Sequence, residues 1–534
     1  MRLLSKISAT CMLLLGLTAS ASDRDGRSVG DFEYIRASEP WTTSRNAAGL
    51  TALPVNRNTR AEGNFLKEDG GIIGNAGSDN SSQAGLMTES YLRISERLAF
   101  YGKLSYSYFN GKDMGGSILM DPDYNPINFH ESVDTTRGTK NREFYHLIGG
   151  ISYSFKNSGW SMGAKIDYMT GNQAKLKDPR FLNVLLNLGT SAGFRFEGNE
   201  NFSFGANLEY RKTVESLIGK IYGTSGKQYY TFIDYGTFYG SRELFEGSDG
   251  MVTSGNTLPM FNSYIGASLQ MEAGSRIKIF NELTYLKRDG YFGNKGSTNI
   301  MFTEHGSNII EYKGILTADS GRNRHMVGID FRYEGMMNYE NVYRFSTQLG
   351  ENSVVEYLSQ NEVLDRTDLS AGLSYTGYSG IENYRPEWEY GAKAVFNSRQ
   401  SLSTIYPFYR SSGYSNCSVE AFGKKNMISG RNIITLGVEG CFLTGFGTPK
   451  EDGILASSSS NAPLSFDTYL YRDFEYKTSS RAGGNLTIRY TRLFNDSIAG
   501  YIQLSDSYVS LLKEPEYLDK GFRNSINITI GCTF

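Results

Sequence analysis

The feature that most constrains this chain is an alternation of apolar and polar residues that recurs along most of its length. From Leu98 to Phe109 the even-numbered positions are leucine, phenylalanine, tyrosine and one glycine, whereas the odd-numbered positions include Lys103 and two serines. Successive side chains of a β-strand point to opposite faces, so a period of two predicts a strand with one apolar and one polar face. The chain contains no run of about 18 apolar residues, which excludes a membrane protein built of helices.

Segments with the same alternation follow one another to the end of the chain. They are residues 145–155, 160–168, 184–196, 202–210, 265–271, 277–285, 325–333, 369–375, 388–396, 434–442, 486–490, 498–504 and 526–534. Tyr153, Phe155 and Trp160 flank the turn at residues 156–159, where we expect an aromatic girdle at a membrane interface. So many strands with aromatic-rich outer faces favour a membrane barrel over a soluble β-sandwich. Abundant glycine (60) and tyrosine (37) with scarce proline (11) fit the same interpretation.

The connections between these segments alternate between short and long. Short links are expected at residues 95–97, 156–159, 197–201, 272–275, 319–324 and 495–496, and long polar ones at 110–141, 212–262, 338–368 and 445–481. Short periplasmic turns and long extracellular loops are typical of outer-membrane proteins. The sequence therefore predicts an all-β chain that forms an antiparallel transmembrane β-barrel of roughly 18 strands, within a range of about 14 to 18.

The first residues have the features of an export signal. Arg2 and Lys6 precede an apolar stretch at residues 7–17, and Ala19-Ser20-Ala21 matches the small-residue cleavage site. We therefore expect a signal peptide at residues 1–21, a periplasmic or lumen-plugging segment at 22–56, and an outer-membrane barrel at 57–534.

The last strand carries the most specific motif. Residues 526, 528, 530, 532 and 534 form one face, of three isoleucines, a cysteine and a final Phe534. A terminal phenylalanine on an alternating strand resembles the β-signal that the barrel-assembly machinery recognises. Phe534 is thus the expected assembly signal, and that machinery is an expected partner together with outer-membrane lipid and lipopolysaccharide.

Two resemblances extend this interpretation. The whole chain is similar to an uncharacterised family of Gram-negative outer-membrane barrels often found near TonB-dependent receptors. Locally, Trp41-Thr42-Thr43-Ser44-Arg45-Asn46-Ala47-Ala48-Gly49-Leu50 resembles the Asn-Pro-Ala-Gly-Leu segment that opens long-chain fatty-acid transporter barrels. In that family the segment belongs to an N-terminal hatch. Here Ala47 replaces the proline, so the resemblance supports a lumen plug and does not imply fatty-acid transport.

Other function classes find little support. The formal net charge is -2 and there is no basic tract, so no nucleic-acid partner is expected. Cys417 and Cys441 fall on opposite faces of neighbouring strands, and with Cys532 they make an odd number, so free cysteines are predicted.

The four histidines do not predict a catalytic or metal site. His130 and His305 are expected in external loops, His146 on an inward face and His325 at the start of a strand on the lipid side. None has a cysteine, histidine or carboxylate at metal-ligand spacing. We therefore predict no enzyme activity, no metal and no cofactor, although His146 could find a partner distant in sequence.

The polar faces predict a lumen in which both charge signs are nearly balanced. The expected lumen-facing charged residues are Glu89, Arg93, Lys103, Lys165, Asp167, Arg195, Glu209, Arg211, Lys278, Glu282, Asp330, Arg332, Glu334, Glu389, Lys393, Glu439 and Arg489. They could form charge rings that select a solute in a water-filled path, or a salt-bridge network that holds the barrel closed or anchors a plug.

The long connection at residues 212–262 is rich in aromatic residues, including Tyr222, Tyr229, Tyr230, Tyr235 and Tyr239. Such a tract could stack on sugars or meet a partner outside the membrane, or it could extend the barrel wall as a hairpin.

The function expected from these features is passive or partner-assisted transport of a small solute across the outer membrane. The alternative is a non-transport role as an accessory or scaffold barrel in a surface complex with a TonB-dependent receptor.

Overall fold

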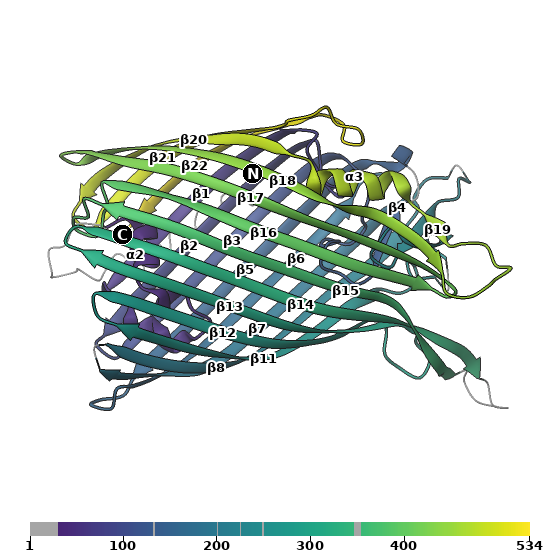
Figure 1. Cartoon of the computed structure of the whole chain (residues 1–534), viewed down its shortest axis with the longest axis horizontal. Helices are drawn as coiled ribbons and strands as arrows, with labels where there is room; N and C mark the ends of the chain where they lie inside the picture. The colour runs from purple at the N-terminus through teal and green to yellow at the C-terminus, as the bar shows by residue number, and fades with distance from the viewer. Residues whose placement is uncertain (1–29, 132–133, 200, 225, 248–249, 347–353) are drawn as a thin grey trace.

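A single closed β-barrel forms most of the molecule (Figure 1). The computed structural model describes residues 30–131, 134–199, 201–224, 226–247, 250–346 and 354–534. Within these ranges eighteen antiparallel strands form one sheet, and β1 (Arg57–Gly70) pairs with both β2 (Asn80–Ser95) and β22 (Phe522–Thr533). The sheet therefore has no free edge, which confirms the predicted antiparallel barrel and its strand number. The predicted signal peptide lies outside the described residues.

The other barrel strands follow the chain in order. They are β3 (Leu98–Met114), β5 (Gly138–Ser154), β6 (Trp160–Lys175), β7 (Arg180–Asn199), β8 (Phe202–Lys220), β11 (Leu258–Gly274), β12 (Ile277–Gly293), β13 (Met301–Ser320), β14 (Asn323–Ser346), β15 (Val354–Ser379), β16 (Trp388–Ile405), β17 (Phe408–Ser429), β18 (Asn432–Ile454), β20 (Arg481–Asn495) and β21 (Ile498–Leu511). A second sheet of four short strands contains β4 (Asn128–Glu131), β9 (Tyr230–Asp234), β10 (Tyr239–Leu244) and β19 (Leu464–Ser465).

The helical elements are few and short. They are α2 (Phe32–Ser38), the 3-10 turns η1 (Pro40–Thr43), η2 (Ala47–Ala52) and η3 (Asp134–Thr136), and α3 (Asp467–Thr478). Within the described ranges no helix has the length and apolar character needed to cross a membrane.

The barrel wall has its apolar face outside and its polar face inside. On β11 the side chain of Leu269 is 63% exposed, whereas that of the next residue, Gln270, is 2% exposed. Ile265 and Ser268 on the same strand show the same contrast. A soluble protein exposes polar side chains and buries apolar ones, so the wall has the reverse arrangement. The arrangement follows from the alternation of apolar and polar residues in the sequence.

The seam between the first and last strands includes the final residue. The backbone N–H of Phe534 donates to the carbonyl of Thr59 at 2.9 Å, and the N–H of Thr59 donates back to the Phe534 carbonyl at 3.0 Å. The Arg57 guanidinium lies 4.8 Å from the centre of the Phe534 ring. Phe534 thus contributes to barrel closure through its backbone and its ring.

The two ends of the barrel differ. At the turn end, short turns join strand pairs such as β2–β3 and β5–β6, and at the loop end the connections are longer. The loop-end connections are nevertheless shorter than predicted: β14 continues to Ser346 and β15 begins at Val354, within the expected loop at 338–368. Strands that continue past the apolar belt have solvent on both sides, so the alternation that marks the belt is no longer required there.

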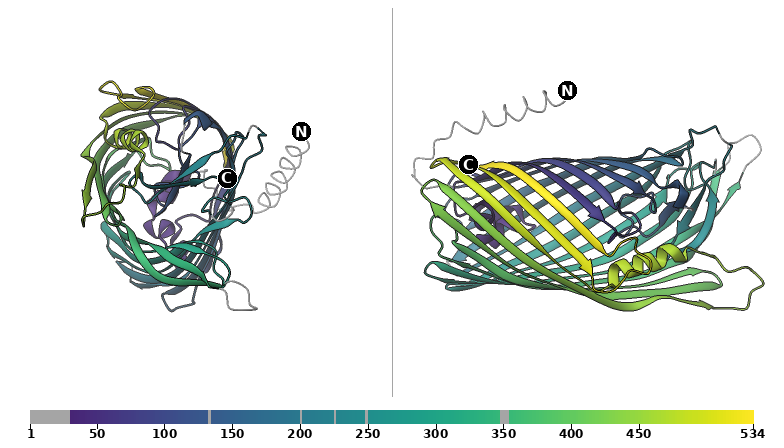
Figure 2. Two further views of the ribbon diagram at one scale, coloured as in Figure 1. Left: turned by 90° about the vertical axis from the view of Figure 1, so that its right-hand side faces the viewer. Right: turned by 90° about the horizontal axis from the view of Figure 1, so that it is seen from above.

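Folded segments fill both ends of the lumen (Figure 2). Residues 30–56, here called the N-terminal segment, lie inside the turn end, where η2 contacts β5, β6 and β7. The inner sheet, made of β4, β9, β10 and β19, lies inside the loop end together with α3. Folded segments of the chain therefore lie inside the lumen at both of its ends.

The outward face can be tested with neighbouring substitutions on β21. Leu504 is outward and 47% exposed, and Ser505 beside it faces the lumen. Leu504→Lys should lower the free energy of unfolding in bilayers by about 2–4 kcal/mol, because a cation would enter lipid near mid-wall. Ser505→Lys should cost much less, because its amine can reach the polar lumen. Denaturant titration in lipid vesicles measures both values, and equal costs would contradict a lipid-facing wall.

Candidate functional site

The N-terminal segment is built from three capped turns. Asp31 caps α2, because its Oδ1 accepts the backbone N–H of Tyr34 at 3.0 Å. Asn46 caps η2 by accepting the N–H of Ala48 at 3.0 Å, and its Nδ2 donates to the carbonyl of Phe194 at 2.8 Å. The cap therefore also ties the segment to the barrel wall.

Close approach of this segment requires glycine in the wall. A Cβ at Gly163 on β6 would lie 2.3 Å from the backbone nitrogen of Ala48. On the other side of the turn, Trp41 is fully buried, packs edge-on against Phe280 at 5.4 Å, and lies under the Arg195 guanidinium at 4.8 Å. The wall is thus shaped to receive the segment.

Arg45 is the main ionic contact between the N-terminal segment and the wall. Its guanidinium pairs with Glu209 of β8 at 2.8 Å and with Glu311 of β13, and its backbone N–H donates to Glu282 of β12 at 3.0 Å. One residue therefore joins the segment to three strands. The alternation correctly predicted that Glu209 and Glu282 face the lumen. It could not predict Arg45 as their partner, because more than 160 residues separate Arg45 from each of them.

Many of the predicted lumen-facing charges are paired. Within the described residues, nine of them form ion pairs: Glu89, Asp167, Arg195, Glu209, Arg211, Lys278, Arg332, Glu334 and Glu389. The other eight have no ion pair to a described residue: Arg93, Lys103, Lys165, Glu282, Asp330, Lys393, Glu439 and Arg489. Among these, Arg93 donates to the carbonyls of Thr51 and Leu53 and so helps to hold the N-terminal segment.

Several inward charges near the loop end lie beyond the segments in which the alternation was recognised. Arg288 of β12, Arg366 of β15 and Arg399 of β16 all lie on the polar faces of their strands. The alternation that identified Lys278 and Glu282 continues to Arg288, but the segment was ended at Tyr285. The missed residues would have been found by extending each strand with the same period.

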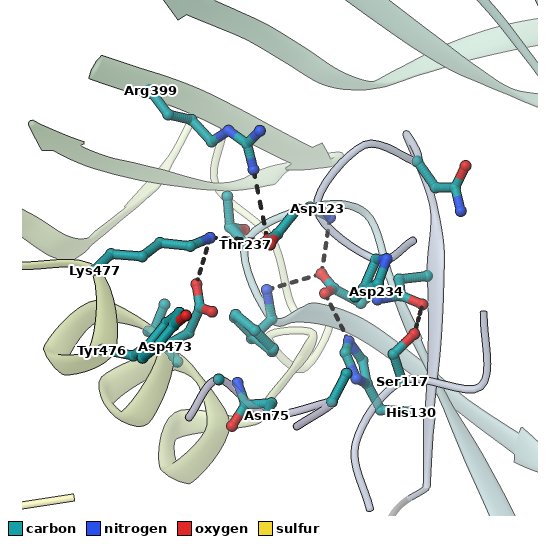
Figure 3. A pocket seen from close by; sticks show the side chains of 18 of the residues that line it. Asn75, Ser117, Asp123, His130, Asp234, Thr237, Arg399, Asp473, Tyr476 and Lys477 are labelled. Carbon is teal, nitrogen blue, oxygen red and sulfur yellow. Dashed lines mark hydrogen bonds and ion pairs between the residues drawn. The ribbon is translucent and has the colours of Figure 1, made fainter. Parts of the chain in front are cut away.

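A cavity of about 380 Å³, here called the outer pocket, lies between the inner sheet, α3 and the wall (Figure 3). It is lined by Asn75, Ser117, Asp121, Asp123, Asn125, Asn128, His130, Arg142, Asp234, Thr237, Phe238, Arg366, Arg399, Tyr414, Phe474, Asp473, Tyr476 and Lys477, among others. The lining is polar, with four aromatic rings.

One side of the outer pocket carries a charged cluster. Lys477 of α3 pairs with Asp473 and with Asp123, each at 2.9 Å, and Arg399 lies 3.9 Å from Asp123 (Figure 3). Burial disfavours the charged amine, but the carboxylates of Asp473 and Asp123 outweigh this effect and raise the pKa of Lys477. Lys477 therefore keeps its positive charge at the pocket, whereas burial raises the pKa of Asp473.

The opposite side is formed by the inner sheet. Asp234 accepts the backbone N–H groups of Gly236 and Phe238, both at 2.8 Å, which shapes the turn between β9 and β10. Gly236 has φ 104°, in the left-handed region that favours glycine. The second carboxylate oxygen of Asp234 lies 2.9 Å from Nε2 of His130. The β9–β10 turn and β4 are thus joined at this pocket.

Among the described residues that line the outer pocket, four buried polar atoms have no hydrogen-bond partner, apart from Nε of Arg366, which forms an ion pair with Asp368. They are Oδ1 of Asn75, Nδ2 of Asn125, Nδ1 of His130 and Oγ1 of Thr237. Buried polar groups are normally hydrogen-bonded, so four unpaired atoms among the lining residues of one cavity are unusual. This is the chemical feature that makes the outer pocket a candidate site.

The aromatic tract differs from its expected form. Tyr222 is 59% exposed, Tyr229 and Tyr230 are half-buried, and Tyr235 and Tyr239 are buried. The tract is therefore not a continuous exposed surface, and its hairpin β9–β10 belongs to the inner sheet instead of the barrel wall. Its aromatic residues are used for packing inside the lumen because the hairpin folds inward.

The histidines also lie differently from the expectation. His305 is on β13 and bonds Asn262 at 2.7 Å, and His130 is in β4, so neither is in an exposed loop. His146 does find a partner, Asp167 of the next strand, at 2.7 Å. Within the described part of the chain, no serine hydroxyl or cysteine thiol is hydrogen-bonded to a histidine, and no group of three His, Cys, Asp or Glu residues could hold a metal. Cys417, Cys441 and Cys532 are free, as predicted.

A family comparison identifies the chain. Its residues 47–534 match the model of DUF6850, a family of unknown function, and the chain belongs to that family. No curated protein matches the chain.

Solved structures with similar barrels include outer-membrane receptors. The ferric preacinetobactin receptor BauA of Acinetobacter baumannii is 8% identical with a TM-score of 0.37, over 90% of this chain and 80% of that one. The outer membrane transporter YddB of Escherichia coli is 7% identical with a TM-score of 0.40, over 89% and 81%. These values carry no information about the activity of this chain. The matched family and structures give no support to the resemblance of residues 41–50 to fatty-acid transporters.

Docking of the N-terminal segment should depend on pH through Glu39. Burial, together with the Glu272 carboxylate, raises the pKa of Glu39 from 4.5 to about 7, although Lys278 and Arg195 act in the opposite direction. A raised pKa means that the docked state favours the protonated acid, so docking is strongest below pH 4.5 and weakens as the pH rises through 7.

Hydrogen exchange of residues 30–56 at pH 5 and pH 8.5, corrected for the intrinsic rate, measures this effect. Protection in the wild type should fall at the higher pH, by up to about 3 kcal/mol. Glu39→Gln should remove most of the difference, and exchange in β21 serves as an internal control. Equal protection of the wild-type segment at both pH values would disprove the assignment to Glu39.

Proposed function

We propose that this protein is an outer-membrane barrel through which a small polar solute passes, and that the N-terminal segment gates the path. The observation that carries the proposal is a polar lumen containing the outer pocket near the loop end and a second cavity of about 600 Å³ beside the N-terminal segment. A barrel that served only as a wall or scaffold would not need cavities lined by charged groups inside its lumen.

The orientation follows from the usual arrangement of such barrels. Short turns lie in the periplasm and longer loops face outward, so the N-terminal segment would close the periplasmic end and the outer pocket would meet the solute first. The apolar belt faces lipid, lipopolysaccharide surrounds the loop end, and Phe534 serves as the signal read by the barrel-assembly machinery.

The contacts of the N-terminal segment suit a gate. Arg45, Asn46 and Arg93 attach it to the wall through side-chain hydrogen bonds and ion pairs. When the segment leaves, the wall groups Glu209 and Glu311 can be solvated by water in the lumen. Opening also separates Trp41 from Phe280 and the buried side chains of the segment from Tyr91 and Ala99, and this loss of apolar burial keeps the segment docked most of the time.

Planar-bilayer recording of three proteins tests the gate. The wild type should conduct rarely, a variant lacking residues 30–56 should give steady ion-conducting steps, and Arg45→Gln should open intermittently, because it loses the ion pairs with Glu209 and Glu311. Lys67→Gln is a control, because Lys67 lies on β1 outside these contacts, and its amine bonds Asn80 among the described residues.

The recorded conductances distinguish a barrel that transports a solute from one that is permanently closed. Folding of each variant is checked by heat-dependent mobility in detergent gels, so that a silent channel cannot be attributed to unfolded protein. A folded variant without residues 30–56 that remained silent would exclude both the gate and the open path behind it.

The second candidate is an accessory barrel in a surface complex with a TonB-dependent receptor. The observation that favours it is the pair β14–β15, whose strands of 24 and 26 residues extend beyond the neighbouring strands at the loop end (Figure 1). Phe345 and Leu358 near its tip are 57% and 53% exposed. A silent barrel that co-purifies with such a receptor, and loses it on Phe345→Ser with Leu358→Ser, would favour this role over transport.

A further inference from the structure

The second cavity, here called the inner chamber, lies between the N-terminal segment and the wall strands β6 to β16. Its volume is about 600 Å³, within the usual range for a small-molecule site. Thr43 and Arg45 of the N-terminal segment contribute to its lining. Arg332, which also lines it, lies 6.0 Å from the ring centre of Tyr124, a residue of the loop that precedes β4.

Cations outnumber anions on the lining of this chamber. Among the described residues that line it, six are cationic and three are anionic; the cations are Arg45, Lys165, Arg211, Lys313, Arg332 and Lys393, and the anions are Glu282, Glu311 and Asp330. The outer pocket differs, because its four aspartates balance its three arginines and one lysine. Among the lining residues, therefore, the inner chamber has an excess of cations and the outer pocket has none, although Asp167, Glu209 and Glu334 lie behind the inner lining and pair with its arginines.

The three arginines are already neutralised by neighbours. Arg45 pairs with Glu209 and Glu311, Arg211 pairs with Asp167 at 3.3 Å, and Arg332 pairs with Glu334 at 2.5 Å. Their charges hold the N-terminal segment and the wall together. They are not the groups most available to a ligand.

The three lysines are available. Lys165, Lys313 and Lys393 form no ion pair with any described residue. Asp330 lies opposite Lys313 in the strand ladder and Glu420 lies opposite Lys393, but neither carboxylate comes within 4.0 Å of the facing amine. Lys165 comes from β6, Lys313 from β13 and Lys393 from β16, so lysines from separate parts of the wall line one cavity.

We propose that the inner chamber binds a small organic anion that carries a phosphate or more than one carboxylate group. Several ammonium groups around one cavity bind such an anion more strongly than a single amine at an open surface would, because their charges act on it together. Ser370 also lines the chamber; its hydroxyl donates to Oδ1 of Asn397, so its oxygen is left to accept a hydrogen bond from the polar body of the solute. The inference rests on the proposed function in one respect: it names the solute class that the barrel would carry.

Equilibrium dialysis of the full chain in detergent tests the chamber without requiring transport. The probes are glucose 6-phosphate and inorganic phosphate, and glucose is the neutral match of the first. The wild type should bind both anions saturably and more weakly as salt increases, and should not bind glucose. The triple variant K165Q/K313Q/K393Q should bind glucose 6-phosphate roughly tenfold more weakly or not at all.

Lys103→Gln is the matched control. Lys103 also faces the lumen without an ion pair, but it does not line the chamber, so this variant should bind as the wild type does. A variant lacking residues 30–56 is dialysed in parallel, so that slow entry past the N-terminal segment is not mistaken for an absence of binding.

Each outcome decides between alternatives. Equal binding by the triple variant and the wild type, binding of glucose as strong as that of its phosphate, or no binding by either the full chain or the variant without residues 30–56 would overturn the chamber assignment. A barrel that conducts ions in bilayers but fails to bind these anions would retain the proposed transport function. A barrel that binds them but never conducts would retain the chamber and lose transport.

Discussion

The wall as a whole depends on closure of the sheet between β1 and β22, because closure gives the two edge strands their hydrogen-bond partners. A strand at the edge of an open sheet has unpaired N–H and carbonyl groups, which hydrocarbon cannot solvate. Eleven residue pairs, from Arg60 opposite Thr533 to Gly70 opposite Arg523, join the first strand to the last. Because the ladder is complete, the outer face can be apolar while the inner face carries charge, and the properties of the lumen follow from this division.

Closure also leaves an interior space that other parts of the chain must occupy. A barrel of eighteen strands encloses more space than its own inward side chains fill. The chain fills it with two kinds of element: the N-terminal segment, which docks through Arg45 and Trp41, and the inner sheet with α3, which packs against the wall through contacts such as Phe129 with Phe292. Between and beside these elements remain the outer pocket and the inner chamber, which differ in their balance of charge.

The alternation predicted the faces of the barrel wall well, because the direction of each side chain in a strand depends only on its position in that strand. Whether a residue such as Leu504 or Lys165 faces out or in depends on strand parity alone, and both residues lie where their parity places them. The same rule was weaker near the loop end. There β14 and β15 continue beyond the apolar belt, and inward residues such as Arg366 were missed because their strand had been ended too early.

The sequence alone determined the fold class, the strand number and the polar character of the lumen, since each depends on a pattern of period two repeated along the chain. It could not determine which charges meet. The pairing of Arg45 with Glu209 and Glu311, the inward folding of Tyr235 and Tyr239, and the meeting of Lys165, Lys313 and Lys393 at one chamber join residues far apart in sequence. Only the tertiary structure decides such contacts, because they depend on how the closed sheet curves and on which segments enter the space that it encloses.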